Sequence, residues 1–110
     1  MAEESSETEQ SIAQLQMIEQ SLQNIMSQKQ QFQMQLIEIE SALKELENAK
    51  EAYKIVGSIM VLSEKDTLKS ELESKKSVIE LRIKSIDRQE NQIREKSAKL
   101  RAKVVEKMSK

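Results

Sequence analysis

The side chains of this sequence that could take part in chemistry are serines, carboxylates and lysines, and their pattern does not make a catalytic site. The sequence contains no histidine and no cysteine, so it lacks an imidazole base and a thiolate nucleophile. Carboxylate pairs such as Glu71 with Glu73 are ordinary helix-surface charges. Gly57 is the only glycine, which excludes a glycine-rich phosphate loop. We expect no enzymatic activity, no cofactor and no metal site.

Basic side chains are concentrated near the C-terminal end, where only Glu95 and Glu106 oppose them. The seven basic residues are Arg94, Lys96, Lys99, Arg101, Lys103, Lys107 and Lys110. One interpretation is a solvated helix end, where cations also suit the helix dipole. Another is docking on an acidic protein surface. Nucleic-acid binding is disfavoured, because no aromatic residue is interleaved for stacking and the net charge is −1.

A short apolar stretch at the middle of the chain is predicted to set which residues of the two halves of the chain face one another. Residues 52–63 crowd β-branched and large apolar side chains around Gly57 without helical spacing. This pattern predicts a β-hairpin that turns at Gly57 and Ser58, with the glycine at the first central position of a type II′ turn. Facing residues then have numbers that add up to 115, such as Val56 with Ile59.

The predicted hairpin has two largely apolar faces. One face carries Tyr53, Ile55, Met60 and Leu62, and the other carries Lys54, Val56, Ile59 and Val61. A lone two-stranded hairpin is marginal in water, so this one is expected to bury itself against copies or relatives of itself. The candidate oligomerisation residues are Tyr53, Ile55, Val56, Ile59, Met60, Val61 and Leu62.

Heptad repeats predict a long helix over residues 11–50 and a second over residues 64–108. The first repeat has the stripes Leu15, Leu22, Lys29, Leu36, Leu43 and Ile18, Ile25, Phe32, Ile39, Leu46. The second has the stripes Leu72, Ile79, Ile86, Ile93, Leu100 and Lys76, Ile83, Glu90, Ser97, Val104. Lys29 is interpreted as extending its ammonium to water, with fixing of the helix register as the alternative. Ser63 is a candidate cap of the second helix.

The two helices and the hairpin agree on one register. If the chain folds back at the turn, Leu36 meets Ile79 and Leu22 meets Ile93, because these numbers also add up to 115. The sequence therefore predicts a mainly α fold, in which a central β-hairpin joins a long antiparallel two-helix coiled coil. We expect a single domain.

Composition agrees with this fold class. Charged residues make up 34% and aromatics 2%, and the absence of proline lets helices continue unbroken. Residues 1–10 are acidic and without apolar periodicity, which predicts disorder. No apolar segment is long enough to span a bilayer, and no signal peptide is recognisable, so we expect a cytoplasmic protein with no membrane partner.

Several apolar residues lie outside the predicted seam between the helices. They are Ile12, Met17, Met26, Met34, Ile37, Leu68, Val78, Leu81, Val105 and Met108. The pairing of residues whose numbers add up to 115, called the 115 register below, gathers Ile12, Met17, Val105 and Met108 at the end of the molecule opposite to the hairpin. They lie there beside Ile18 and Val104. They are either an apolar clamp for unfolded chains or a helix groove, or they are scattered surface residues, which are common.

The sequence resembles a prefoldin β subunit of the archaeal, single-hairpin class. The match rests on the aromatic-Lys-x-Val-Gly pattern of residues 53–57, the apolar strand that follows it, and residues 81–90 of the second helix. It covers the whole chain. The link at residues 47–51 departs from the Asp- or Pro-containing turn that is frequent in the family and contains strong helix formers instead.

The resemblance implies a function for this fold. It implies a hexamer of two α and four β subunits, whose hairpins assemble into β-barrels. It also implies an ATP-independent holdase that captures non-native polypeptides at the coiled-coil tips and transfers them to a group II chaperonin. The alternative is a structural coiled-coil tether or adaptor that binds one specific helical partner.

The resemblance also suggests residues for these roles by their location. The candidate client-binding residues are Ile12, Leu15, Met17, Ile18, Leu100, Val104, Val105 and Met108. The candidate residues for docking on the chaperonin are Lys99, Arg101, Lys103 and Lys107.

Overall fold

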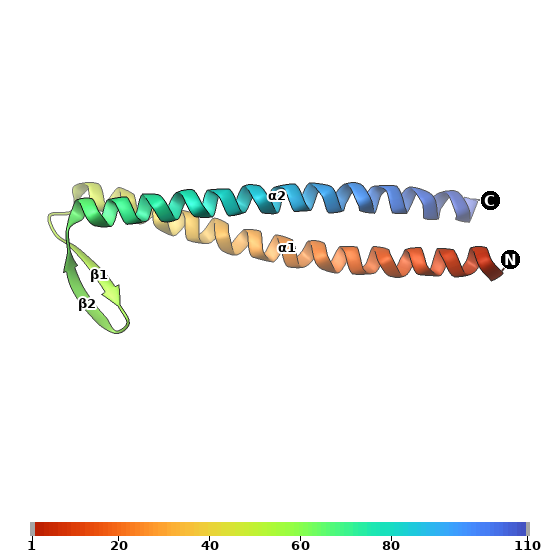
Figure 1. Cartoon of the computed structure of the whole chain (residues 1–110), viewed down its shortest axis with the longest axis horizontal. Helices are drawn as coiled ribbons and strands as arrows, with labels where there is room; N and C mark the ends of the chain where they lie inside the picture. The colour runs from red at the N-terminus through yellow and green to blue at the C-terminus, as the bar shows by residue number, and fades with distance from the viewer. Residues whose placement is uncertain (1, 110) are drawn as a thin grey trace. The chain divides into compact units, whose positions relative to one another are not determined.

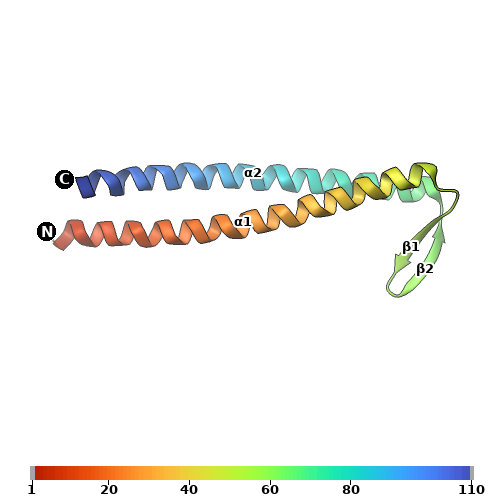
Figure 2. The same ribbon diagram turned by 180° about the vertical axis from the view of Figure 1, so that it is seen from behind.

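The computed structural model describes the backbone of residues 2–109 and the side chains of residues 6–109. The elements follow one another as α1 (Ala2–Asn48), β1 (Ala52–Val56), β2 (Ile59–Ser63) and α2 (Lys65–Ser109). The chain forms two compact units. The hairpin unit is residues 30–84, and the terminal unit combines the chain up to Lys29 with the chain from Ser85 onward. In each unit α1 and α2 lie side by side and antiparallel (Figures 1 and 2).

The predicted seam is the line along which the helices bury side chains. In the terminal unit, every seam residue from Leu15 to Ile25 is half-buried, while Ile86, Ser97 and Val104 are buried. In the hairpin unit, Leu46 and Ile79 are buried and the other seam residues are half-buried. The heptad interpretation is therefore confirmed for both helices. Leu68, which the sequence places off the seam, is half-buried and extends it by one turn.

The predicted pairing of the hairpin is confirmed. β1 and β2 are antiparallel, with Tyr53 opposite Leu62 and Val56 opposite Ile59. Gly57 has a φ of +62°, and Ser58 has no positive φ. This combination excludes a type I′ turn and agrees with the type II′ turn that places glycine first.

The junctions between helices and hairpin differ from the expected ones in detail. α1 ends at Asn48, and the Lys65 ammonium donates a hydrogen bond of 2.9 Å to the Glu47 carbonyl, one of the carbonyls that a helix end leaves unpaired. Ser63 does not cap α2, because it pairs with Ala52 as the last residue of β2. Glu64 takes this position instead, since its carbonyl accepts the first helical bond, from the Leu68 N–H at 3.0 Å.

The N-terminal segment is helical where disorder is predicted for residues 1–10. α1 begins at Ala2, and Met1 lies outside the described residues. The segment lacks glycine and proline and is rich in glutamate, which suits the positive end of the helix dipole. The Lys107 ammonium also contacts a Glu7 carboxylate oxygen at 2.5 Å and ties this turn to α2. Charge and tertiary contact thus take the place of the missing apolar periodicity.

Candidate functional site

The β-hairpin presents an exposed apolar surface. All seven candidate oligomerisation residues are exposed, from 47% for Val61 to 69% for Ile55. Strand residues with β-branched or long apolar side chains are normally covered in a folded protein. The hairpin is therefore a candidate interaction surface by its exposure as well as by its sequence.

The two faces of the hairpin are not equivalent. The face of Lys54 contacts α2, because the Lys54 ammonium lies 3.1 Å from a Glu71 carboxylate oxygen. Ala52 on this face is buried. On the opposite face Ile55, Met60 and Leu62 are 64–69% exposed, against 47–65% for Val56, Ile59 and Val61 on the face of Lys54. This second face is the more available one for another chain.

Tyr53 lies at the edge of the available face. Its hydroxyl donates a hydrogen bond of 2.7 Å to a Glu51 carboxylate oxygen. This bond to a negative acceptor raises the pKa of Tyr53 above its ordinary value, so the phenol stays protonated. The bond joins Tyr53 of β1 to the residue that directly precedes the strand.

The structure divides the eight candidate client-binding residues into two groups. Ile12, Met17, Val105 and Met108 are exposed. Leu15, Ile18 and Leu100 are half-buried in the seam, and Val104 is buried there. Only the first group offers surface to a partner.

The exposed group is itself divided between two edges of the seam. If Leu15 and Ile18 are heptad positions a and d, Ile12 is at position e, on one side of the seam. Met17 is at position c, on the side of the g positions, which is the other side of the seam. Val105 and Met108 fall on the same edge as Ile12, because like edges meet in an antiparallel pair. The apolar end of the terminal unit is therefore a main patch with Met17 separate from it.

The four candidate docking cations are all exposed at this end. Among the described residues, Lys107 alone of the four has an ion pair, with Glu7, and this contact lowers the pKa of the Glu7 carboxyl below its ordinary value. Lys99, Arg101 and Lys103 are exposed within little more than one turn of α2. These three residues are the basic surface: Arg101 lies on the same edge of the seam as the apolar patch, and Lys99 and Lys103 lie on the other edge.

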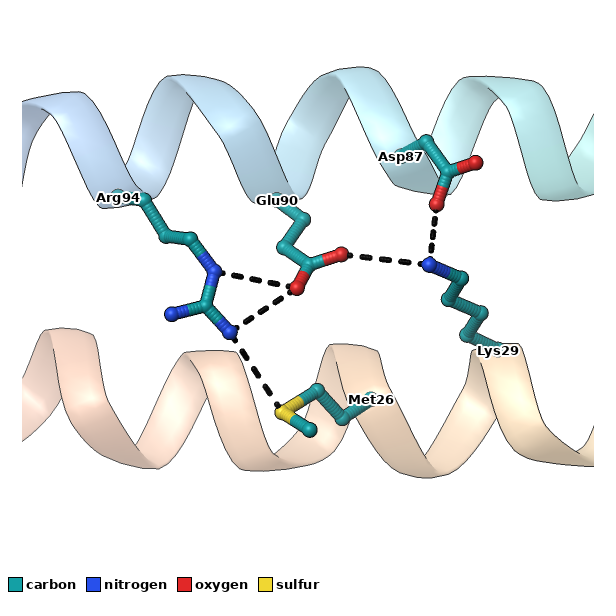
Figure 3. A network of polar contacts seen from close by, with 5 residues as sticks. All are labelled: Met26, Lys29, Asp87, Glu90 and Arg94. Carbon is teal, nitrogen blue, oxygen red and sulfur yellow. Dashed lines mark hydrogen bonds and ion pairs between the residues drawn. The ribbon is translucent and has the colours of Figure 1, made fainter.

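Sequence reasoning missed a polar network in the terminal unit (Figure 3). The Lys29 ammonium lies 2.5 Å from an Asp87 oxygen and 3.5 Å from a Glu90 oxygen. Arg94 contacts Glu90 at 3.0 Å and approaches the Met26 sulfur at 3.9 Å. The preferred interpretation, in which Lys29 simply reaches water, is incomplete. The signal was present, because Glu90 interrupts the apolar stripe of the second helix close to Lys29 in the 115 register.

Because of this network, we expect the free energy of unfolding to fall as the pH rises through the alkaline range. A hydrogen bond to Asp87, reinforced by the charge of Glu90, raises the pKa of Lys29 above its ordinary value. A raised lysine pKa contributes stability that is complete below the unfolded-state pKa and is lost as pH rises through the folded-state pKa. We therefore expect the urea midpoint of the native chain to exceed that of Lys29→Gln near neutral pH, and the difference to shrink above the ordinary lysine value. Urea unfolding across this range measures it.

A matched variant gives the control for this prediction. Lys44 is exposed and has no ion pair within the described chain, so Lys44→Gln removes the same charge without a network. Its midpoint should follow that of the native chain at every pH. A difference between the native chain and Lys29→Gln that stays constant through the alkaline range would contradict the role of the ion pairs.

Neither a metal-binding cluster nor a membrane-spanning helix is found in the described part of the chain. No group of three or more histidine, cysteine, aspartate or glutamate side chains is placed to hold a metal ion within residues 2–109. No helix in the same range is apolar enough, over a sufficient length, to cross a membrane. The candidate site therefore consists of two interaction surfaces, one on the hairpin and one at the helix ends.

Comparison with known proteins gives one consistent family. The family model described as "Prefoldin subunit" matches residues 9–110. The prefoldin subunit beta of Archaeoglobus fulgidus is 38% identical over 96 residues, which cover 84% of this chain and 83% of that protein. The prefoldin subunit beta of Thermococcus kodakarensis is 35% identical, with 84% and 82% covered. The crystal structure of the prefoldin beta subunit from Thermococcus strain KS-1 superposes with a TM-score of 0.84 at 34% identity, over 89% of each chain.

Proposed function

The chain belongs to the prefoldin family, and from this we propose that it is a β-type subunit of an ATP-independent holdase. In this proposal it assembles through its hairpin, captures non-native polypeptides at its helix ends and passes them to a group II chaperonin. The observation that carries the proposal is the exposed hairpin of seven apolar residues on a chain that matches prefoldin β subunits over most of its length.

Assembly follows from the cost of leaving the hairpin in water. Burying an exposed Ile, Val, Leu or Met side chain contributes about 1–2 kcal/mol, and the hairpin offers seven large apolar side chains at once. Its strand edges also carry unpaired backbone groups that another hairpin can pair. Both needs are met when hairpins of several subunits join into a β-barrel. We propose partners of the same β type and of the α type, in a hexamer of two α and four β subunits.

Client capture is assigned to the exposed apolar residues of the terminal unit. Ile12, Val105 and Met108 offer a patch to exposed apolar segments of an unfolded chain, and methionine adapts to varied shapes. A single patch of this size binds weakly. Several subunits that act on one client raise the avidity while each contact stays reversible. Such capture needs no nucleotide.

Transfer to the chaperonin is assigned to the basic surface. Lys99, Arg101 and Lys103 are exposed at the same end as the client patch, so a chaperonin with an acidic surface would meet both together. Lys107 is less available, because it pairs with Glu7. Exposed charges of this kind favour fast, salt-sensitive docking.

The proposed function is tested by assembly and by aggregation assays. We expect the native mass to rise to that of a hexamer when the chain is mixed with an α-type prefoldin subunit. The complex should suppress aggregation of a denatured protein at substoichiometric amounts without ATP. A lone dimer that neither associates with the α-type subunit nor affects aggregation would overturn the proposal and favour a coiled-coil tether.

A further inference from the structure

The terminal unit contains a groove along one edge of its seam. Its volume is about 440 Å³. Ser21, Asn24, Gln89 and Gln92 provide its polar lining, and Ile25 and Ile93 are the seam residues at its base. Both helices contribute equally, with two polar residues and one isoleucine each. The groove is separate from the patch of Ile12, Val105 and Met108, because none of these three residues lines it.

The lining of this groove has unused hydrogen-bonding capacity. Ser21, Asn24, Gln89 and Gln92 make no side-chain hydrogen bond within the described residues. Each carboxamide has two N–H donors and one acceptor oxygen, and the serine hydroxyl acts as both donor and acceptor. No charged side chain lines the groove. Its chemistry therefore fits an uncharged ligand that donates and accepts in alternation.

The uncharged character continues along α1. This edge of α1 consists of heptad positions g and c in alternation. Its residues are Gln14, Met17, Ser21, Asn24 and Gln28, and all of them are exposed. At a rise of about 1.5 Å per residue the row is about 21 Å long, which matches about six residues of an extended chain. On α2, the uncharged stretch ends at Lys96 in the direction of the C-terminus. Met17, the exposed candidate residue outside the main patch, belongs to this row.

The opposite edge of the seam differs in charge. It carries the network of Lys29, Asp87, Glu90 and Arg94, whose groups are already paired with one another (Figure 3). A polar ligand on that edge would have to displace ion pairs. The two edges of the same coiled coil thus offer different surfaces. On one edge the charged groups pair with each other, and on the other edge the carboxamides can form hydrogen bonds with a ligand.

We propose that this amide-lined groove binds the backbone of an extended, non-native polypeptide segment. An extended peptide presents N–H and C=O groups in alternation, which is the pattern that carboxamides complement without regard to sequence. A helix or a folded domain has its backbone groups already satisfied and brings no such complement. An anion or a cation would find no opposite charge in the lining. The isoleucines at the base accept small apolar side chains of the segment.

The inference rests on the proposed function, because it gives the same client a second contact of another kind. The apolar patch binds exposed hydrophobic side chains, whereas the groove forms hydrogen bonds with the backbone of the unfolded segment. A client engaged by both is held as long as it remains extended. Folding removes both signals, since it buries the side chains and satisfies the backbone.

A triple substitution tests the groove. Asn24→Asp, Gln89→Glu and Gln92→Glu together keep the shape but remove the N–H donors that the peptide carbonyls need. The probe is a fluorescent, reduced and carbamidomethylated disulfide protein, which cannot refold, and its affinity is measured on the full chain in its native oligomer. We expect Kd to rise about five- to tenfold. The matched control is Gln16→Glu, Gln20→Glu and Gln23→Glu, which adds the same charge at exposed positions outside the groove and should change Kd less than about twofold.

Site-specific photo-crosslinking identifies the occupant. A photo-reactive amino acid in place of Gln92 should crosslink the probe, whereas one in place of Arg88, which is exposed on the outer face of α2, should not. Equal Kd values for both triple variants, or crosslinking from Gln92 only to a second copy of this chain, would overturn the groove proposal while probe binding at the helix ends persisted. Absence of any probe binding by the native oligomer would overturn the proposed function and the groove proposal together.

Discussion

Replacing Ile55 by aspartate is expected to break the oligomer into smaller species. Ile55 is 69% exposed on the hairpin face opposite to Lys54, so the substitution costs little in an isolated subunit. In a barrel the same carboxylate would be buried among Tyr53, Met60 and Leu62 without a partner. An unpaired polar or charged group in such a place costs about 3 kcal/mol or more, which weakens each association by more than about a hundredfold. Native mass spectrometry or light scattering measures the result.

The control for this prediction is an equal change at an exposed apolar residue on a helix. Met34 is 59% exposed on α1, and Met34→Asp should leave the native mass unchanged. Val61→Asp probes the other hairpin face, where the side chain is 47% exposed. We expect it to reduce the mass as well, because a barrel strand also packs on the face turned toward its own helix. Unchanged mass for both hairpin variants would show that the hairpin is not the element of assembly.

The register of the molecule could be predicted because three independent patterns agree on it. One glycine fixes the turn, and the heptads of both helices then align without further choice. The ion pairs of the structure support this, since Lys29 with Asp87 and Glu40 with Lys76 both lie within one residue of the 115 register. Apolar periodicity reports directly on burial, which dominates the energy of a coiled coil.

Features that depend on polar contacts were harder to predict. The helical state of residues 2–10 and the ion pairs of Lys29 involve side chains whose sequence pattern does not distinguish paired from solvated charge. Ser63 shows a related limit, because it is a good cap by type but is recruited into the β-ladder. At Ser63 the local preference was overridden by tertiary pairing.

The candidate client site was predicted only in outline for a similar reason. Location along the chain placed eight apolar residues at the free helix ends. The heptad phase decides which of them face the seam, and it assigns Leu15, Ile18, Leu100 and Val104 to the interior. Exposure, rather than location, selects the residues that can meet a client.

This selection leads to the prediction with the largest effect on activity. Replacing Ile12, Met17, Val105 and Met108 together by serine should abolish most suppression of client aggregation while leaving the oligomer intact. All four side chains are at least 40% exposed, so the seam keeps its packing. Each lost apolar contact weakens client binding by about 1 kcal/mol, and the loss is repeated on every arm that holds the client. We expect more than about a tenfold higher concentration to be needed for equal suppression.

Substitution is a sharper test than truncation at this end. Removing the N-terminal turns of α1 and the C-terminal turns of α2 would also delete Leu15, Ile18, Leu100 and Val104, so lost activity could come from an opened seam. The matched control replaces Met34, Ile37, Val78 and Leu81 by serine, four exposed apolar residues of the hairpin unit. It removes a similar apolar area away from the helix ends. If both quadruple variants lose activity equally, with native mass and helical circular dichroism unchanged, client capture is spread along the helices; if neither loses activity, it does not depend on these exposed apolar side chains.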